Sequence, residues 1–492
     1  MLVEKRTKAA SGWPAPNVSA SDTKKRAPSS DTMRRAEIQA TLRWLDARDK
    51  GPMAAASRRT RSALVRRFDR LNAPIVYPWS PSMNGAHPAH RLHRTAATLL
   101  RVRSPGAFGK AWLHAKAVAW PVLAMAAAVP VVLRCWKHVR DRHGFGLREQ
   151  CRDVIDAALN HGIFPTEYYN RRVYASAARE DKSLYINERE MIALLSGADR
   201  GSGSPRVDDL ECLYAECRKA GILVPRSVAF FSRGSIEIVG GSGSLLLPEK
   251  DLFVRPKDWT VDAPGEYWRW MPKARAWSFD GETLVAAALL KRVRMRCLAH
   301  PCVLQEAVAN HPEVARFSQG GLCSYKVAAG VDPQGNPHVL FASFRFPGAD
   351  LSGESAVSVD LTSGVDIVSG RLLPAVGEFV TDGEFDNHPA TSAIITGAAA
   401  PHWREVAALA LKAHRLFADV PFIGWEIGVG ANGPIVLDAS SNWGFFPHVL
   451  PSETKFASFC VQHLMRGRQG DLDVPVFPPS QTGGEAAFAP PL

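Results

Sequence analysis

The stretch Phe422–Trp443 constrains the fold of this chain more than any other, because it contains two short apolar segments that each carry one acidic residue. Glu426 lies in the first segment and Asp438 in the second, and the glycines between the segments predict a tight turn. The pattern predicts a β-hairpin. If both carboxylates lie on one face of that hairpin, their oxygens are suited to bind Mg²⁺.

The length of the turn decides whether the two acids meet. A two-residue turn at Asn432–Gly433 sends them to opposite faces of the hairpin, because Glu426 then lies opposite Ala439. A three-residue loop, which adds Ala431, places Glu426 directly opposite Asp438. Spacing alone favours two separate, solvated acids.

The charge distribution divides the chain of 492 residues into a basic front and a mildly acidic body. Residues 1–150 contain 28 Lys and Arg against 9 Asp and Glu, whereas residues 151–492 contain 32 against 39. The net charge of +12 therefore arises in the front and does not predict a nucleic-acid-binding body. The proportions of charged (22%) and hydrophobic (46%) residues exclude a wholly disordered chain, a collagen-like repeat and a polytopic membrane protein.

Residues 1–105 have the composition of a disordered basic arm, rich in Pro, Ser, Ala and Arg with little apolar periodicity. Within this arm His87, His90 and His93 form an HxxHxxH pattern, for which Pro88 and the neighbouring arginines favour a polar loop over a metal site. No apolar segment follows the charged first residues, so we expect no secretory signal. The basic front is also suited to contact an anionic membrane surface.

An uncharged run of 17 residues, Ala117–Leu133, lies between Lys116 and Arg134. As a helix it would extend about 25 Å, which is short of the ~30 Å hydrocarbon core of a bilayer. Burial against the body, contact with a membrane surface and a membrane span are the three interpretations of this run. Its length and the basic residues behind it favour surface contact over a span.

From Leu147 onwards helices and strands alternate irregularly, which predicts a globular α+β body. The eight cysteines include no CxxC pair, so we expect reduced thiols rather than a metal site. The expected parts are an arm over 1–105, a helical lead-in over 106–200, a body over 201–465 with a lid over 225–305 and a core over 306–465, and a Pro- and Gly-rich tail over 466–492.

The hairpin stretch resembles the last hairpin of ATP-grasp enzymes, most closely that of the sugar-transfer-associated ATP-grasp proteins, which are similar to the alpha-L-glutamate ligases. That family has a Gly-Trp-Asp strand, a Gly-Pro turn and a strand that ends in Glu-Gly-Asn, with Trp three residues on. The matching residues here are Gly424-Trp425-Glu426, Gly433-Pro434, Asp438-Ala439-Ser440 and Trp443. The matching segments upstream are Gln305-Glu306, His311-Pro312-Glu313, His388-Pro389-Ala390-Thr391 and Pro401-x-Trp403. Ile222–Pro225 resembles the entry to the family's lid domain and Trp120-Pro121 resembles its N-terminal lead-in, so that the resemblance covers roughly residues 115–465.

This resemblance implies an ATP-grasp fold, in which two α+β subdomains clamp a nucleotide. It implies a ligase-like protein that uses ATP and Mg²⁺ to activate a small-molecule carboxylate as an acyl phosphate and to transfer it to an amine or another nucleophile, in cell-surface polysaccharide modification. The implied catalytic residues are Arg255 and Lys326. The implied ATP-binding residues are Arg255, Lys257, Gln305, Glu306 and Lys326, and the implied Mg²⁺ ligands are Glu426, Asp438, Ser440 and Asn442.

The chain departs from the family pattern where Arg255 stands for Lys, Lys326 for Arg, Asp438 for Glu and Ser440 for Asn. The loop Asp258–Gly265 also has few glycines to approach phosphates. These departures leave an alternative, which is a catalytically degenerate nucleotide-binding or membrane-associated scaffold. For either function we expect a cytoplasmic protein, with a peripheral position at the inner face of the membrane as a variant, and no specific nucleic acid partner.

Overall fold

The computed structural model divides the chain into two units, Met1–Arg58 and Arg59–Leu492, and the residues that it describes all lie in the second. Most of the predicted arm, the interior of the glycine-poor loop and the tail beyond residue 466 lie outside the described residues. The described residues are 88–102, 106–175, 179–199, 204–232, 235–239, 246–257, 265–298, 300–318, 320–350, 358–444, 446 and 455–466.

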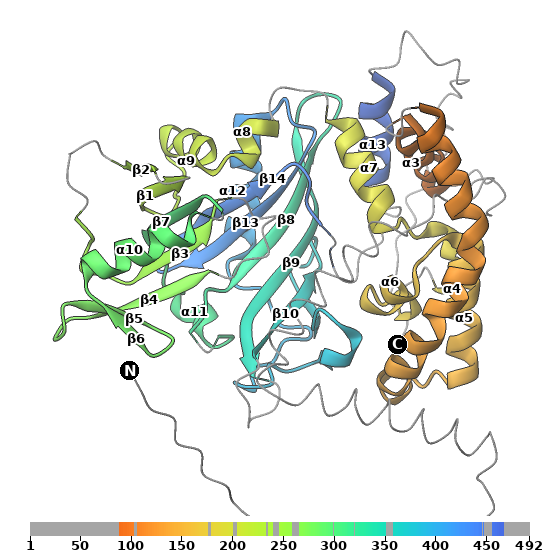
Figure 1. The fold of residues 1–492 in the computed structure, drawn as a ribbon, viewed down its shortest axis with the longest axis horizontal. Helices are drawn as coiled ribbons and strands as arrows, with labels where there is room; N and C mark the ends of the chain where they lie inside the picture. The colour runs from red at the N-terminus through yellow and green to blue at the C-terminus, as the bar shows by residue number, and fades with distance from the viewer. Residues whose placement is uncertain are drawn as a thin grey trace, which may run out of the picture. The chain divides into compact units, whose positions relative to one another are not determined.

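Two antiparallel sheets form the body, which together with the helices confirms the expected α+β class (Figure 1). The lid sheet has the strand order β2-β1-β7-β3-β4-β5-β6, and the core sheet has the order β12-β11-β10-β9-β8-β13-β14. The lid strands are β1 (Ser227–Ser232), β2 (Ser235–Ile238), β3 (Leu252–Pro256), β4 (Glu266–Met271), β5 (Ala276–Phe279), β6 (Glu282–Leu284) and β7 (Cys302–Glu306). The core strands are β8 (Ser324–Val331), β9 (Pro337–Asp350), β10 (Ser358–Val365), β11 (Leu372–Val376), β12 (Glu384–Phe385), β13 (Phe422–Gly430) and β14 (Gly433–Ser440).

Helices precede the lid sheet and pack on both sheets. They are α3 (Pro88–Val102), α4 (Gly106–His143), α5 (Leu147–His161), α6 (Pro165–Asn170), α7 (Glu188–Ala198), α8 (Ser204–Asp208), α9 (Leu210–Lys219), α10 (Ala286–Arg296), α11 (Pro312–Ala315), α12 (Trp403–His414) and α13 (Lys455–Arg466). Short 3-10 helices are η2 (Val173–Ala175), η4 (Lys182–Leu184), η5 (Val380–Asp382) and η6 (Arg415–Phe417).

Strand alternation gives each sheet one apolar face and one face that carries charge. On β3, Leu252 and Val254 are fully buried in an apolar cluster with residues of α10, so Arg255 points to the other face of the lid sheet. On β13, Trp425 and Ile427 are fully buried in the cluster that includes α12, so Glu426 points to the other face of the core sheet.

The last hairpin places the two acids opposite each other as expected, but neither of the two expected turns forms. Residues 431 and 432 make a two-residue turn, with Gly430 paired with Gly433, whose φ of 100° lies in the left-handed region. Continued without interruption, this register would pair Glu426 with Leu437. The pairing instead shifts by one residue between Glu426 and Ile427, so that Glu426 lies opposite Asp438.

Helix α3 corrects the prediction of a disordered arm and a polar loop for residues 88–102. Ala89, Leu92 and Ala96 recur along one face of α3 and are fully buried in a cluster with residues of α7 and α13. His90 and His93 are also buried, because each ring finds hydrogen-bond partners in the protein. Histidines inside the apolar stripe concealed its helical period.

The uncharged run 117–133 lies within α4, a single helix of 38 residues with Pro121 and Pro130 in its interior. One side of this helix is buried, and Trp120 donates from Nε1 to the carbonyl oxygen of Ala158 on α5 at 2.7 Å. The other side exposes large apolar residues, including Val118 and Val122, which are 82% and 73% exposed. Among the described residues, Val118–His143 of α4 is long and apolar enough to cross a membrane.

Candidate active site

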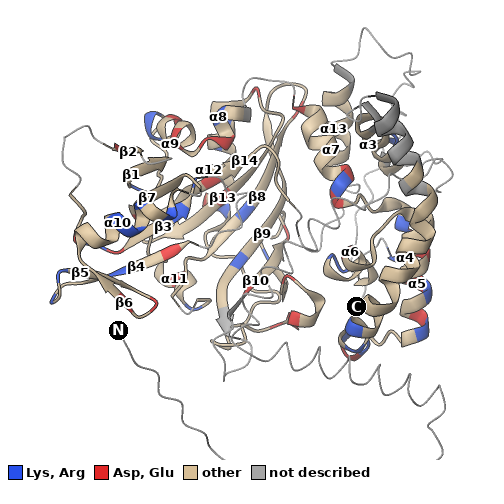
Figure 2. Ribbon diagram, in the orientation of Figure 1, with Lys and Arg blue, Asp and Glu red and all other residues tan. Residues whose placement is uncertain are grey.

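A row of charged side chains crosses three neighbouring strands of the core sheet. Lys326 on β8 pairs in register with Glu426 on β13, which pairs in turn with Asp438 on β14. Residues paired directly across strands share a face of the sheet, so all three side chains lie on the face opposite the apolar core. Figure 2 shows basic and acidic positions on these strands and on neighbouring strands of both sheets.

Arg255 joins the lid sheet to this row. Its Nη2 donates to Oδ2 of Asp438 at 2.8 Å, and both side chains are largely buried. Burial would lower the pKa of Arg255, but the charges of Asp438 and Glu426, the Tyr214 hydroxyl and the hydrogen bond to Asp438 together outweigh it and raise that pKa. The pKa of Asp438 is raised, because burial and the Glu426 charge together outweigh Arg255. Among the described residues, the buried Nε of Arg255 has no hydrogen-bond partner, so the guanidinium keeps a free donor beside the row.

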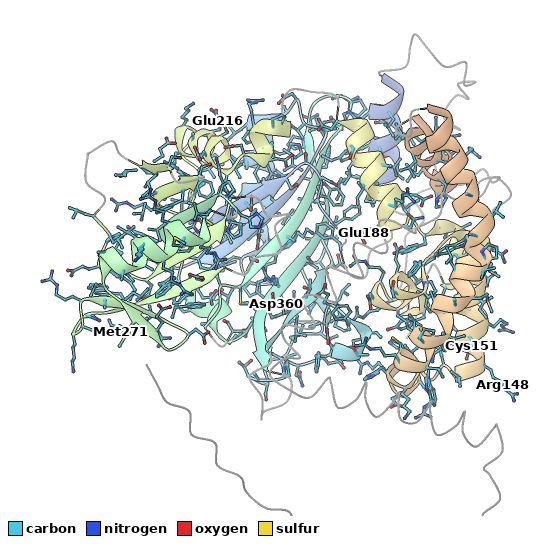
Figure 3. All side chains as sticks on the ribbon, viewed as in Figure 1. Arg148, Cys151, Glu188, Glu216, Met271 and Asp360 are labelled. Atoms are coloured by element: carbon cyan, nitrogen blue, oxygen red, sulfur yellow. The ribbon has the colours of Figure 1, made fainter. Side chains whose placement is uncertain are left out.

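Glu426 is held by residues from β8 and β9. Ser324 donates from Oγ to Oε1 of Glu426 at 3.2 Å, and Nη1 of Arg345 lies 3.6 Å from the same oxygen. Arg345 also pairs with Asp360, which Figure 3 labels on β10. Arg345 is not among the residues that the sequence predicts for this site, because its pairing with Ser324 depends on an irregularity between Ala328 and Ala329 in the register of β8 and β9.

Lys326 is the basic member of the row. Burial lowers the pKa of Lys326 to about 8, against the attraction of Glu426. Its Nζ lies 5.2 Å from the ring centroid of Phe446, and within the described part of the chain no oxygen accepts a hydrogen bond from it. Lys326 therefore presents an unpaired cation beside two carboxylates.

The expected Mg²⁺ ligands lie next to one another, and their chemistry fits the ion. Ser440 follows Asp438 by two residues, is buried on the same face and accepts from the backbone N–H of Asn442 at 3.1 Å. Asn442 is exposed just beyond the end of β14. Two carboxylates and a hydroxyl form the hard oxygen set that Mg²⁺ prefers, with the Arg255 contact as a competitor for Asp438.

The two remaining residues that were expected to contact the nucleotide, Gln305 and Glu306, differ in whether their side chains are available. Gln305 is buried on β7, on the same face of the lid sheet as Arg255, and no residue that the structure describes donates a hydrogen bond to its Oε1. The carboxylate of Glu306 pairs with Arg226 at 3.4 Å and with Lys250 at 2.9 Å, so its side chain is already neutralised.

Lys257 does not join the row. Its Nζ lies 3.3 Å from Oδ2 of Asp209 and also pairs with Glu211, at the start of α9. Because two carboxylates compete for this ammonium, Lys257 is a poor substitute for a phosphate-binding lysine on β3.

Gly424 explains why glycine and tryptophan occur together in the hairpin motif. A Cβ atom at Gly424 would lie 2.3 Å from Cβ of Trp443, which is far too close. Trp443 packs there with Phe446 and closes one end of the face that bears the row.

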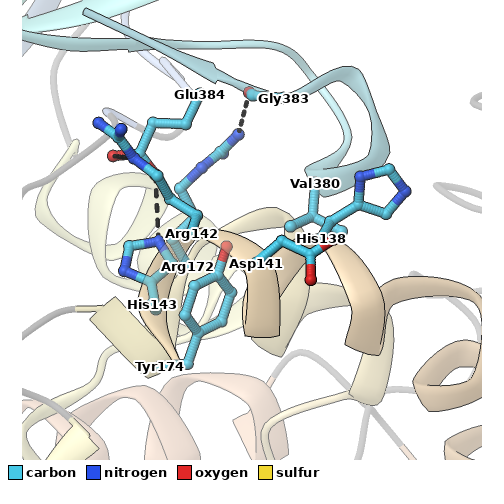
Figure 4. A pocket seen from close by; sticks show the side chains of 9 residues that line it. All are labelled: His138, Asp141, Arg142, His143, Arg172, Tyr174, Val380, Gly383 and Glu384. Carbon is cyan, nitrogen blue, oxygen red and sulfur yellow. Dashed lines mark hydrogen bonds and ion pairs between the residues drawn. The ribbon is translucent and has the colours of Figure 1, made fainter. Parts of the chain in front are cut away.

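A separate cavity of about 280 Å³ lies between α4 and the region of η5 and β12 (Figure 4). Two of its polar side chains already have partners in the protein: Nε2 of His143 lies 3.2 Å from Glu384, and the buried Arg172 donates to the backbone carbonyl oxygen of Gly377 at 3.3 Å. These contacts join the helical region to the core sheet, and no residue of the row lines the cavity.

Two antiparallel sheets contribute charged side chains to one row, as the resemblance to ATP-grasp proteins implies. Residues 294–455 match the model of the sugar-transfer associated ATP-grasp family, which confirms the expected resemblance over about a third of the chain. Curated proteins provide no match.

Solved ligases show weak likenesses in fold. The VanG D-Ala:D-Ser ligase of Enterococcus faecalis is 11% identical with a TM-score of 0.30 over 54% of this chain, which spans 62% of that ligase. The D-alanine–D-alanine ligase of Bacillus anthracis complexed with ATP is 10% identical, with a TM-score of 0.31 over 54% of this chain and 69% of that one. The L-amino acid ligase of Bacillus licheniformis is 9% identical, with a TM-score of 0.26 over 54% and 45%.

Proposed function

We propose that this protein is a ligase that uses Mg²⁺ and ATP to activate a carboxylate as an acyl phosphate and to transfer the acyl group to an amine or another nucleophile. The observation that carries the proposal is the row of Lys326, Glu426 and Asp438 on one face of the core sheet, next to a cation from the lid sheet. Two carboxylates for a metal and two cations for phosphates then lie together, with Lys326, Glu426 and Asp438 on the core sheet and Arg255 on the lid sheet.

Each residue of the row has a role in this proposal. Glu426, Asp438 and Ser440 hold the metal ion, and Arg255 and Lys326 bind the phosphates and stabilise the charge that develops on them. Bound Mg²⁺-ATP supplies an electrophilic γ-phosphorus, to which a carboxylate oxygen bonds as the bond to ADP breaks, before the nucleophile displaces phosphate. Gln305 offers its unpaired amide oxygen to the base.

The place of the reaction in cell-surface polysaccharide modification is also a proposal, and the description of the matching family supports it. The scaffold is the second candidate function. The ion pair between Arg255 and Asp438 favours it, because the guanidinium occupies a carboxylate that the metal needs.

We further propose that the protein binds peripherally to an anionic membrane surface through α4. Val118, Val122, Met125 and Val129 lie on one exposed side of the helix at helical spacing. Arg140, which is exposed, follows on the same side and complements anionic headgroups. Because the opposite side of α4 packs on α5, the helix is suited to lie on a bilayer rather than to cross it.

Phosphate release by the purified full chain tests the ligase. With Mg²⁺, ATP and pooled amino acids and sugar acids, we expect steady release of phosphate that requires both a carboxylate and an acceptor. Thermal stabilisation by Mg²⁺-ATP without phosphate release would instead support the scaffold. Absence of both effects at millimolar nucleotide would reject the two functions together.

A further inference from the structure

Three side chains away from the charged row converge where α11 and α12 begin. They belong to His311, Glu313 and His402, and their ligand-capable atoms all lie within 4.8 Å of one another. The backbone N–H of His311 donates to the carbonyl oxygen of Val429 at 2.9 Å, which holds the start of α11 against the end of β13. These residues far apart in the sequence therefore meet at a defined place in the core.

Two of the three distances within this cluster match those of a tetrahedral metal site, and the third pair lies within 4.8 Å. Nε2 of His402 lies 3.3 Å from Nδ1 of His311 and 3.3 Å from Oε2 of Glu313. Nitrogen and oxygen atoms bound at about 2.0–2.1 Å to a tetrahedral ion lie about 3.4 Å from each other. The two distances from Nε2 of His402 therefore differ from the tetrahedral value by only a few tenths of an ångström.

The hydrogen-bonding partners of these side chains show which ring nitrogens carry protons, and the atoms that face the centre of the cluster are acceptors that could bind a cation. Nδ1 of His402 donates to the carboxylate of Glu405, so a neutral His402 presents a lone pair on Nε2. Nδ1 of His311 also presents a lone pair, since it accepts from the backbone N–H of Glu313 at 3.2 Å. The carboxylate of Glu313 only accepts. With His402 neutral, the lone pair on its Nε2 faces the Glu313 carboxylate at 3.3 Å, and the two repel unless a positive charge lies between them.

Two further features are typical of a metal-binding histidine. A carboxylate on the remote ring nitrogen, as Glu405 provides for His402, orients the ring and strengthens its other nitrogen as a ligand. His402 also has a φ of 56°, a left-handed backbone that histidine adopts only at some cost. Glu313 is 66% exposed, so the cluster opens to solvent and leaves room for a water ligand.

We propose that His311, Glu313 and His402 bind a divalent transition metal ion of the Zn²⁺ type, with Glu405 as the residue that orients His402. Two imidazoles and one carboxylate select such an ion over Mg²⁺, which prefers oxygen ligands alone. Coordination by Nδ1 of His311 replaces its contact with the Glu313 amide. The metal ion ties α11 to α12 and is distinct from the metal ion of the charged row.

Titration of the full-length protein with Co²⁺ at pH 8, without nucleotide, tests this site. We expect the visible absorption bands of a tetrahedral ion without the near-ultraviolet thiolate band that a cysteine site would add. His402→Asn should remove the bands, and asparagine tolerates the left-handed backbone at this position. Glu405→Gln should weaken binding by about 10- to 100-fold, as loss of an orienting carboxylate does.

Two matched variants control for other sites. His338→Gln removes a histidine that pairs with Asp332 elsewhere in the core sheet, and Asp438→Asn disables the charged row, so both should keep the Co²⁺ bands. Far-ultraviolet circular dichroism checks that every variant folds. The proposal would be overturned if the wild-type protein showed no tetrahedral bands, or if the bands survived in His402→Asn. The positive charge between the carboxylates of Glu313 and Glu405 would then be that of a protonated His402.

Discussion

The buried ion pair between Arg255 and Asp438 has the largest energetic consequence at the scale of single residues. Loss of one partner from such a pair leaves an unpaired buried charge and costs about 3–5 kcal/mol. We therefore expect Arg255→Met to lower the free energy of unfolding by about this amount in urea, without nucleotide. Arg255→Met combined with Asp438→Leu should recover most of the loss, and equal instability of the single and double variants would contradict this expectation.

The two acids of the row should control the response to nucleotide. Mg²⁺-ATP at about 100 times its dissociation constant stabilises a folded protein by about 2.7 kcal/mol. We expect wild type to melt at a higher temperature with Mg²⁺-ATP, and Glu426→Gln and Asp438→Asn to lose this shift, because an amide is a poor ligand for Mg²⁺. Glu216→Gln, on α9, should retain it (Figure 3). If both acid variants showed the same increase in melting temperature as wild type, Glu426 and Asp438 would not be ligands of the metal ion.

At the scale of elements, a buried histidine couples the docking of α3 to pH. His93 contacts Glu190 through Nδ1 at 2.8 Å and the carbonyl oxygen of Ser183 through Nε2 at 2.9 Å, so both ring nitrogens face acceptors. Burial would lower the pKa of His93, but Glu190 and these hydrogen bonds outweigh it and raise the pKa above 6.5.

A raised pKa in the folded protein makes stability depend on pH in one direction. The contribution of His93 is fully present below pH 6.5 and is lost as pH rises through its folded pKa. We expect the melting temperature of wild type to fall over that range, and that of His93→Gln to be lower at acidic pH and to lack this component. His300→Gln, at an exposed histidine, should behave like wild type. An identical pH profile in His93→Gln would exclude this coupling.

Local pattern predicted the elements better than it predicted their exact pairing. The α+β class, the last hairpin and the opposition of Glu426 and Asp438 all follow from apolar periodicity and from the family resemblance. The one-residue shift beside Glu426 could not be predicted, because a bulge depends on contacts with other elements, such as the bond from Tyr214 to the Leu437 carbonyl oxygen. The sequence suggests Lys257 as a phosphate-binding residue because it does not reveal that Asp209 and Glu211 lie beside this side chain.

At the scale of the whole molecule, the exposed side of α4 should determine membrane association. Burial of one valine side chain contributes about 1.5 kcal/mol or more, which corresponds to about a tenfold change in binding. We expect Val122→Glu and Val129→Glu each to reduce cosedimentation with phosphatidylserine vesicles at least tenfold.

Val368→Glu is the matched control, because Val368 is 92% exposed outside α4. It should bind vesicles like wild type, and added salt should weaken binding of both proteins. The membrane proposal would be contradicted if the wild-type protein did not bind vesicles but formed a dimer that Val122→Glu dissociates. A second copy of the chain would then cover the exposed side of α4.

The contact between Arg255 and Asp438 changes how the chain's divergence from its relatives is understood. Where the family has Asp, Glu and Lys, this chain has Glu426, Asp438 and Arg255. Relative to that pattern, the longer acid (Glu) and the shorter acid (Asp) have exchanged positions across the hairpin. The long basic side chain of Arg255 contacts the shorter acid, Asp438. In this chain the three residues act together, because Arg255 contacts Asp438 and Asp438 lies opposite Glu426. In descendants of this chain, Arg255 and Asp438 should be inherited, or lost, as a pair.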